Sequence, residues 1–570
     1  MRVSRLFCCS VVTAAAVVLV TTASPAADQI SVQGVRVPSV SVPRVPTPGT
    51  PGSKIDPVAS PRAGVQGGPR RLTAARAEAF AEAARRGLNY LPGEVVVKFR
   101  SGMGAASMQR ALDAVSSRPD ANGLEWHSDV ALLRDPSQPD AHQLAAQLSA
   151  QPEVEFAEPN YIARISPIEK QFVTGGAPVP TPPDAPASFW RSTSFRTTGT
   201  PSDTDFGAYQ WNFNLINMPA AWDVVPGGSA DLIVAVVDTG ITLAAQTMTF
   251  PLWTGSAIQN VQMTFAVNPD LPASRLVSSR DYAFLDPQGP VVDMEGHATH
   301  VSGTIAQATN NSFLTAGMAY NVRIMPVKVC SSYWEIMIVR AQNGQTGFAP
   351  SDSGGCSFVD MSDGLRYAAD NGAKVINMSL GGTSQSTLLR DSLAYAVSRG
   401  VFVALSTGND FEEGNPTQYP ARYAIDFEGV MSVASVAKNS AKAYYSSTGS
   451  YVEIAAPGGD SRQGLGTTDR GLIWQSTLLG TDSVPGSLGV IRPRFDRYDK
   501  QSYQGTSMAS PHVAGLAALI MSQTPGISPA AVERIIRNTA KDLGDPGRDT
   551  HFGSGLIQPR TALYGYSVNR

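Results

Sequence analysis

The sequence is poor in charge and, beyond its first residues, in long apolar runs. Charged residues make up 16% of the 570 residues, and the formal net charge is −3. This balance gives no electrostatic reason to expect binding to nucleic acid or to an anionic membrane surface. No later segment is apolar over the roughly 20 residues needed to cross a bilayer. We therefore expect neither nucleic acid nor a membrane among the partners of the mature chain.

Cysteine is also scarce, with four in the chain, and two of these lie in an N-terminal segment interpreted below as a signal peptide. Cys330 and Cys356 would remain, in an oxidising compartment that favours a disulfide. They bracket a polar, Gly-rich excursion between an apolar strand and a helix. Closing a loop of about 25 residues contributes roughly 3 kcal/mol in the chain-entropy description. We expect a disulfide, the alternative being two buried free thiols.

The N-terminus has the features of a targeting segment. Two arginines precede an apolar stretch at 6–20, and small residues follow at 21–27. This combination is typical of a secretory signal peptide, and the apolar stretch is shorter than most membrane anchors. We expect cleavage near Ser24–Ala27, so that 1–27 is a signal peptide. The mature protein would be secreted, either extracellular or periplasmic in transit.

Composition divides the next part of the chain. Residues 28 to about 69 are rich in Pro, Gly, Ser and Val without a regular period, which predicts a spacer. The Ala-rich stretch 70–87 predicts a short helix ended by Gly87, so spacer and helix together span 28–87. Residues 166–205 are again rich in Pro, Thr and Ser, which suits an exposed, cleavable linker.

Two folded units are expected, one on each side of that linker. Residues 88–165 have the β-α-β-β-α-β order of a ferredoxin-like, split βαβ module. Residues 206–570 alternate apolar strands with helical patterns, which predicts an α/β domain whose parallel sheet is buried on both faces. The first unit has expected strands at 94–99, 124–127 (poorly marked), 129–135 and 154–165, and helices at 106–115 and 141–150. The second has expected strands at 232–238, 323–329, 374–380, 401–407 and 430–436, and helices at 363–372 and 386–400.

Three segments of the larger domain carry reactive side chains. Asp238 ends an apolar strand, and functional groups of parallel sheets lie at the carboxyl ends of strands; the alternative is a plain Asp-x-Gly turn. His297 begins a helix of small residues, together with His300, but the segment lacks the carboxylate or cysteine that a zinc motif needs. Ser507 opens another small-residue helix, whose N–H groups would stabilise negative charge, or it is only a helix cap.

Together these segments resemble the subtilase family of serine proteases. The Asp238-Thr239-Gly240 run is similar to its Asp motif, 297–303 to its His motif, and GTSMASPHVAG at 505–515 to its Ser motif. The resemblance implies a subtilisin-like three-layer domain with a mostly parallel central sheet. It also implies a catalytic triad of Asp238, His297 and Ser507, in the chain order of subtilisin itself. One departure is Ala298, where the family usually has Gly; the extra methyl could cost stability but should not remove the imidazole.

The resemblance extends to substrate binding and to the propeptide. The run 377–382 is similar to the strand that pairs with substrate, which implies Ser379, Leu380 and Gly381 as substrate-binding residues. The run 406–409 is similar to the segment that carries the oxyanion-hole residue, here Asn409. The unit 88–165, which closes with VEFAEPN, resembles the family's propeptide, an intramolecular chaperone and inhibitor.

The resemblance also implies a structural calcium ion. The run 309–315 is similar to the family's calcium loop, with hard oxygen ligands of the kind that calcium prefers. The usual Asp ligand has no clear counterpart, because 241–290 looks like an insertion, and a plain turn is the alternative. The implied ligands are the side chain of Asn311 and the carbonyls of Thr309, Phe313 and Thr315.

These features predict a monomeric, secreted serine endopeptidase that acts on proteins or peptides without a catalytic cofactor. A non-catalytic relative should have lost a site residue, and an esterase should show G-x-S-x-G with the order Ser, Asp, His; neither applies. The acidic residues Asp410, Glu412 and Glu413 either favour a basic residue near the scissile bond or form a solvated loop.

We expect the precursor to cut itself within about 162–205. Nothing in the sequence selects among the basic residues there, and the roles of the insertions at 241–290 and 460–500 stay open. The candidate cleavage points are Arg164, Lys170, Arg191 and Arg196.

Overall fold

The fold is taken from a computed structural model. The expected signal peptide, the spacer and most of the linker lie outside the described residues, as do Lys170, Arg191 and Arg196. Within the described ranges no helix is long and apolar enough to cross a membrane. The structure describes residues 72–115, 124–165, 200–285, 291–347, 354–464, 466–479 and 493–568.

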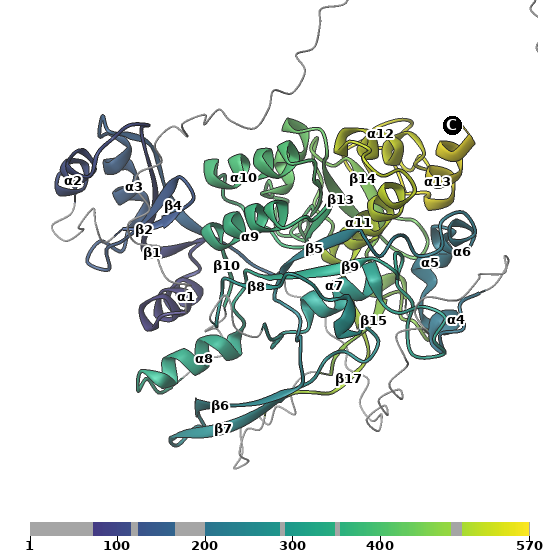
Figure 1. Ribbon diagram of the computed structural model, residues 1–570, viewed down its shortest axis with the longest axis horizontal. Helices are drawn as coiled ribbons and strands as arrows, with labels where there is room; N and C mark the ends of the chain where they lie inside the picture. The colour runs from purple at the N-terminus through teal and green to yellow at the C-terminus, as the bar shows by residue number, and fades with distance from the viewer. Residues whose placement is uncertain are drawn as a thin grey trace, which may run out of the picture. The chain divides into compact units, whose positions relative to one another are not determined.

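A seven-stranded parallel sheet forms the centre of the C-terminal domain (Figure 1). Its strands are runs rich in Val, Ile and Ala, which suit burial on both faces. All five strands expected from the sequence are confirmed, and β8 and β14 are added at the two edges. In spatial order the strands are β14 (Ile454–Pro457), β13 (Val430–Val436), β12 (Phe402–Ser406), β11 (Val375–Met378), β5 (Ile233–Asp238), β9 (Arg323–Lys328) and β8 (Arg280–Asp281).

Successive side chains of these strands point to opposite faces and build two cores. Val234 and Val236 of β5 pack in one core with α7 and α11. Ala235 and Val237 pack in the other core with α9 and α10. The three-layer, subtilisin-like architecture is therefore confirmed. The four helices are α7 (His297–Ala306), α9 (Phe358–Asp370), α10 (Thr387–Ser398) and α11 (Thr506–Gln523).

The N-terminal unit is an antiparallel sheet in the order β4-β1-β3-β2, with α2 and α3 packed on one face. Its element order is the expected one, including the short strand that was poorly marked in the sequence. Strand β10 (Cys356–Ser357) of the C-terminal domain joins the same sheet beside β4. The elements are β1 (Tyr90–Phe99), α2 (Ala105–Asp113), β2 (Glu125–His127), β3 (Val130–Arg134), α3 (Ala141–Ser149) and β4 (Val154–Ala163).

Helix α1 (Ala74–Arg86) precedes this unit, within the stretch that predicts it. The Thr73 hydroxyl accepts a hydrogen bond from the first turn, and Gly87 ends the helix at φ 65°, a left-handed conformation that glycine adopts without strain. Its apolar side packs against α8 (Tyr333–Gln342). Helix α8 lies within the excursion between the two cysteines, which the sequence analysis described only as polar and Gly-rich.

The N-terminal unit also contacts α10 through Glu158 of β4. Its carboxylate accepts hydrogen bonds from the backbone N–H of Thr387 at 2.8 Å and of Leu388 at 3.3 Å. The hydroxyl of Ser386, the N-cap of α10, donates to the same carboxylate. Burial raises the pKa of Glu158, and these donors oppose that rise. A side chain of the N-terminal unit thus completes the first turn of a helix in the C-terminal domain.

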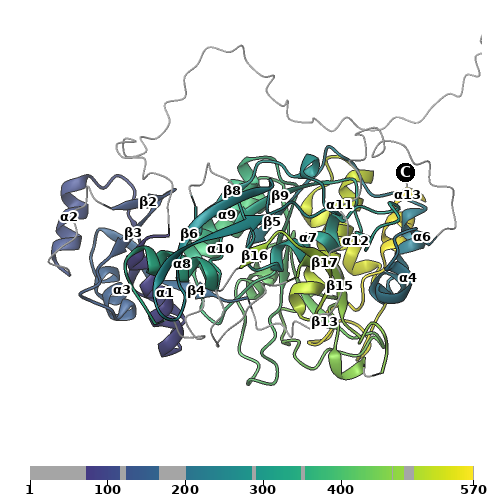
Figure 2. The same ribbon diagram turned by 90° about the horizontal axis from the view of Figure 1, so that it is seen from below.

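The two insertions left open by the sequence come together in one small sheet (Figure 2). Strand β16 of the second insertion pairs with β7 of the first, and the rings of Phe265 and Phe495 stack with centroids 5.2 Å apart. Helix α8 packs against β6 of this sheet. The sheet consists of β6 (Gln246–Trp253), β7 (Ile258–Phe265) and β16 (Arg494–Phe495). Strands β15 (Ile473–Leu478) and β17 (Tyr498–Tyr503) pair antiparallel in a separate two-stranded sheet.

Short helices complete the domain. They are α4 (Phe206–Tyr209), α5 (Trp211–Leu215), α6 (Met218–Trp222), α12 (Pro529–Asn538), α13 (Pro559–Val568) and the 3₁₀ turns Ala273–Arg275, Ala421–Asp426 and Ser461–Gln463.

Candidate active site

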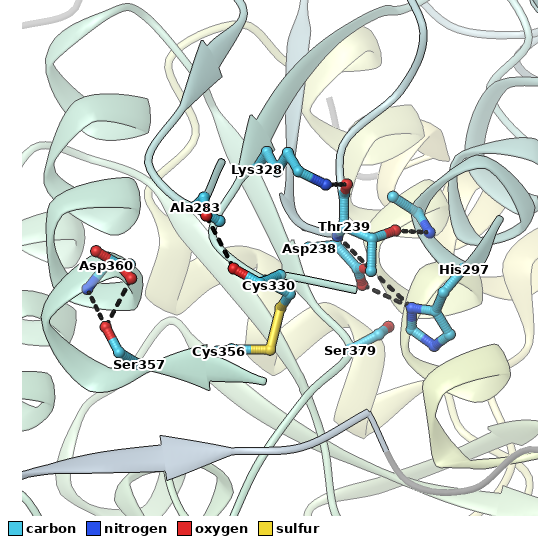
Figure 3. The surroundings of a disulfide bond; sticks show 12 residues. Asp238, Thr239, Ala283, His297, Lys328, Cys330, Cys356, Ser357, Asp360 and Ser379 are labelled. Atoms are coloured by element: carbon cyan, nitrogen blue, oxygen red, sulfur yellow. Dashed lines mark hydrogen bonds and ion pairs between the residues drawn. A yellow bond between two sulfur atoms is a disulfide. The ribbon is translucent and has the colours of Figure 1, made fainter. Parts of the chain in front are cut away.

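Asp238 and His297 form a buried pair. Asp238 is the last residue of β5 and His297 is the first of α7, and neither side chain is exposed. Nδ1 of His297 lies 2.8 Å from Oδ1 and 3.0 Å from Oδ2 of Asp238 (Figure 3). Nε2 is buried and has no hydrogen-bond partner in the part of the chain that the structure describes. The carboxylate therefore orients the imidazole and leaves Nε2 for other chemistry.

A hydrogen-bond network ties the start of α7 to the end of β5. The hydroxyl of Thr239 accepts from the backbone N–H of Ala298 at 3.0 Å. Asp293 accepts from the backbone N–H of Gly296 at 2.8 Å and from the hydroxyl of Thr299 at 2.6 Å. Gly296 has φ 88°, which favours glycine at this tight entry to the helix. The methyl of Ala298 is buried in the core, and the imidazole still faces Asp238.

A buried lysine lies behind the same strand end. Lys328 is the β9 residue in register with Asp238, and its Nζ donates to the carbonyl of Thr239. Nζ also lies 2.9 Å from Oε1 of Glu335 on α8, and both side chains are fully buried. Burial raises the pKa of Glu335 to about 7, although Lys328 lowers it. Nothing in the sequence indicates this pair, because Lys328 lies inside an otherwise apolar strand.

His300, the second histidine of this segment, is held by a backbone contact and by ring stacking. Its Nε2 lies 3.1 Å from the carbonyl oxygen of Ile473, and its ring stacks on Tyr503 with centroids 4.3 Å apart. Burial lowers the pKa of His300 to about 3. Its ring is therefore neutral near neutral pH and contributes to packing.

Ser507 is the second residue of α11, and its hydroxyl points to the strand segment after β11. Oγ of Ser507 donates to the carbonyl of Ser379 at 3.1 Å, and Oγ of Ser379 donates to the carbonyl of Ser507 at 2.9 Å. Among the described residues no hydrogen bond joins Ser507 to His297, although α7 packs against α11. The Ser507 hydroxyl is thus held at the segment 379–381, of which Leu380 is buried.

Asn409 follows β12 and contacts the residue before Ser507. Its Oδ1 accepts from both the backbone N–H and the hydroxyl of Thr506, each at 2.9 Å. Because the oxygen has these two donors, the amide nitrogen is the end left to donate. A Cβ on Gly505 would lie 3.3 Å from that nitrogen, so the backbone beside it is closely packed. An oxygen atom that develops negative charge at Ser507 could be bound by this amide.

The end of β4 lies between two edges of the C-terminal domain. On one side it pairs antiparallel with β10, and on the other Arg164 forms an antiparallel bridge with Gly381. The backbone N–H of Arg164 donates to the carbonyl of Gly381 at 3.1 Å. The chain is thereby held as an extended strand beside the segment that binds Ser507, as in peptide recognition by strand addition.

The expected disulfide is confirmed and supports one of these edges. The sulfur atoms of Cys330 and Cys356 are 2.06 Å apart, and the two residues are separated by 26 positions (Figure 3). Cys330 directly follows the β9 region, and Cys356 begins β10. The bond therefore attaches the β10 edge, which pairs with β4, to the central sheet.

Two of the acidic residues after Asn409, Asp410 and Glu412, are engaged with neighbours. Both carboxylate oxygens of Glu412 contact Arg462, at 2.6 and 2.7 Å, on the surface. Oδ2 of Asp410 accepts from Nε2 of Gln418 at 2.7 Å, and burial raises the pKa of Asp410. The paired charge of Glu412 favours the interpretation as a solvated loop.

The loop 309–315 lies against two carboxylates that the sequence analysis missed. Asn311 donates to Oδ1 of Asp270 at 2.7 Å, and the backbone N–H of Asn310 donates to Oδ2 of Asp203 at 2.8 Å. The other oxygen of Asp203 is buried without a hydrogen-bond partner in the described structure. Burial raises the pKa of Asp203 to about 6 and that of Asp270 well above its usual value. Asp270 comes from the insertion in which the sequence showed no counterpart of the family's Asp ligand.

This oxygen-rich surrounding fits calcium. The described residues contain no group of three or more His, Cys, Asp and Glu that could hold a metal. A calcium ion, however, takes carbonyl and amide oxygens as readily as carboxylates. Two buried carboxylates beside the carbonyl-rich loop supply that mixture.

Comparison with known proteins agrees with this arrangement. Residues 229–555 match the Subtilase family, and residues 76–160 match the Fervidolysin N-terminal prodomain. The chain is 29% identical, over 83% of its length and 88% of the relative's, to the thermophilic serine proteinase of Bacillus sp. strain AK1. It is 30% identical, over 64% of its length and 99% of the relative's, to thermitase of Thermoactinomyces vulgaris.

A solved structure shares the fold. Fervidolysin from Fervidobacterium pennivorans, described as a keratinolytic enzyme related to subtilisin, has a TM-score of 0.55 at 22% identity. The match covers 84% of this chain and 61% of that one, and at this identity it concerns the fold alone. The family match covers more than half of the chain. The chain therefore belongs to the Subtilase family, as a subtilisin-like serine protease with a fervidolysin-like N-terminal prodomain.

Proposed function

We propose that this protein is a secreted, monomeric serine endopeptidase made as a self-processing zymogen. The observation that carries the proposal is the arrangement around Ser507. The buried Asp238–His297 pair, the Asn409 amide and the segment 379–381 belong to neighbouring elements of the sheet and its helices. An extended strand of the chain's own prodomain lies beside them, as a bound peptide would.

Each residue would have one role in peptide hydrolysis. Ser507 Oγ turns from the Ser379 carbonyl toward Nε2 of His297, loses its proton to that nitrogen and attacks the scissile carbonyl. His297 then protonates the leaving amine, which departs and leaves the acyl group on Ser507. Water attacks this ester with His297 as the base, and the proton returns to Ser507 Oγ as the acid is released, while Asp238 holds the imidazole tautomer. The Asn409 amide and the Ser507 backbone N–H bind the oxyanion. These steps need no cofactor.

The test of this function compares two substrates. The purified mature enzyme should hydrolyse casein, and a serine-directed covalent inhibitor should abolish that hydrolysis. A short-chain ester serves as the second substrate. Ester hydrolysis without casein hydrolysis would indicate a different serine hydrolase, and the absence of both would indicate a non-catalytic protein.

Asn409→Leu is expected to lower kcat by about 10²–10³ with little change in KM, because the amide would act only once the oxyanion forms. Steady-state kinetics on one peptide substrate measures both constants. Asn371→Leu, an exposed residue at the end of α9, is the matched control and should keep wild-type rates. A rise in KM at unchanged kcat would assign Asn409 to substrate binding instead.

Secretion and inhibition by the prodomain belong to the same proposal. The N-terminal arginines, apolar stretch and small residues support export. A relative from Xanthomonas campestris is named an extracellular protease, and this chain is 34% identical to it over 64% of its own length and 57% of the relative's. The pairing of the prodomain strand with Gly381 supports its role as an inhibitor, since substrate is proposed to bind at the same segment.

We also propose that a structural calcium ion binds between the loop 309–315, Asp203 and Asp270. Chelation is expected to lower the Tm by roughly 5 °C, since a ligand at 100 times its Kd stabilises by about 2.7 kcal/mol. Thermal unfolding of a catalytically inactive variant, which avoids autolysis, measures the shift. Asp270→Asn should remove the calcium dependence, whereas Asp231→Asn, on the surface, should keep it. Equal Tm values with calcium and with chelator would contradict the site.

A further inference from the structure

The prodomain contacts the start of α9 with two basic side chains. Arg76 donates to Asp360, with Nη2 at 2.8 Å from Oδ2 and Nη1 at 3.3 Å from Oδ1. Nδ1 of His127 lies 2.8 Å from Oδ2 of Asp363. Asp360 and Asp363 are three positions apart, so they share one face of the helix. The catalytic domain thus presents an acidic helix face, and the prodomain places the Arg76 guanidinium and the His127 imidazole on it.

Arg76 binds at a site formed by Ser357 and Asp360. Ser357, the N-cap of α9, accepts from Nη2 of Arg76 and donates to Oδ2 of Asp360 at 2.7 Å. Asp360 is 2% exposed and Arg76 is 3% exposed. Burial disfavours the charged guanidinium, but Asp360 and Glu94 raise the pKa of Arg76 above its usual value. Charge-assisted hydrogen bonds of this kind replace water around a cation effectively.

The site formed by Ser357 and Asp360 lies beside strand β4. Ser357 is in register with Ile162 of β4. Two residues earlier, the buried side chain of Asn160 accepts from the backbone N–H of Val359 at 3.3 Å. The same side chain donates to Glu94, whose carboxylate lies 3.9 Å from Arg76. A peptide that follows the path of β4 would therefore direct the side chain in the place of Asn160 toward the first turn of α9.

We propose that Asp360 and Ser357 form, in the mature enzyme, a subsite for a basic side chain of the substrate. The inference rests on the proposed function, because release of the prodomain removes Arg76 and Glu94 and leaves Asp360 beside the path that β4 follows. A lysine or arginine is longer than asparagine and can reach the place that the Arg76 guanidinium now fills.

The strand register gives the position of this residue. Arg164 is opposite Gly381, and Ser379, two residues before Gly381, contacts Ser507. A residue opposite Ser379 would be the first before the scissile bond, so the place of Arg164 is the third. Asn160 precedes Arg164 by four residues, and its place is therefore about the seventh (3 + 4) before the scissile bond.

The test is an arginine scan in peptide substrates. One arginine is moved from the fourth to the ninth residue before the scissile bond of an otherwise constant peptide, with glutamine at the other positions. The mature wild-type enzyme should show kcat/KM about 3–10-fold higher with arginine near the seventh position, and high salt should reduce the gain. Lysine at that position should give a similar gain.

Variants and outcomes separate this inference from the proposed function. Asp360→Asn should remove the gain, and Asp370→Asn, at the exposed end of the same helix, should retain it. If Asp360→Asn does not yield mature enzyme, the wild-type scan alone still decides. A scan that is flat from the fourth to the ninth position overturns the subsite while hydrolysis itself persists. If no peptide in the series is cleaved, the proposed function has failed instead.

Discussion

Ser507→Ala is expected to lower kcat by about 10⁶, a loss of the size known for the nucleophile of subtilisin itself. The substitution removes the only atom proposed to attack the scissile carbonyl, while its one donated hydrogen bond, to the Ser379 carbonyl, is a small part of the packing around α11. Folding should therefore be retained. Peptide hydrolysis and the circular-dichroism melting curve measure the two effects separately.

Inhibition by a retained prodomain must be distinguished from loss of the nucleophile. Both the variant and the wild type can be trimmed in parallel with an unrelated protease, which is then inactivated. Ser522→Ala, near the other end of α11, is the matched control and should keep full activity. Substantial activity in trimmed Ser507→Ala would mean that another residue is the nucleophile.

The second prediction with a large effect concerns the maturation cut, which we expect in the wild type and not in Ser507→Ala. Wild type should yield a mature chain that begins between about Ser166 and Phe206, and Ser507→Ala should remain a longer proform. The reason is geometric, since β4 delivers the chain to the segment 379–381 just before the linker. Residues 88–165 should stay bound as an inhibitor until they are degraded.

N-terminal sequencing and mass spectrometry of both proteins measure this outcome. Of the basic residues considered as cleavage points, Arg164 has its backbone bonded to Gly381. The register that makes it the third residue before the scissile bond places the cut after it and not at it. Identical trimming of wild type and Ser507→Ala in a protease-free host would show that the cut is made by another enzyme.

The sequence predicted the fold correctly and indicated a candidate triad because both are carried by contiguous patterns. The apolar strands of the sheet are continuous runs, and Asp238, His297 and Ser507 each lie inside a motif of adjacent residues. Asp238 ends a parallel strand, and the carboxyl edge of such a sheet is where functional groups are expected. Such patterns can be recognised from adjacent residues, without knowing which distant segments contact them.

The missed residues depend on contacts between distant segments. Asp203 and Asp270 contact the loop 309–315 across separations of 107 and 41 residues. Both precede this loop, in parts of the chain without a clear sequence pattern. Lys328 lies in an apolar strand, and nothing nearby in the sequence indicates that Glu335 of α8 faces it. Strand β10 has only two residues, and its pairing with β4 arises from docking between units.

The contact of Glu158 with α10 gives a way to time the departure of the prodomain during activation. Glu158 leaves with the prodomain, and the backbone N–H groups of Thr387 and Leu388 then lose their carboxylate acceptor. Backbone N–H groups at a helix start that lose such an acceptor hydrogen-bond to water instead. Hydrogen–deuterium exchange at these two amides should therefore accelerate when the prodomain departs. The exchange rate would follow departure itself and not the cut, and the interval between the two events becomes measurable without any substrate.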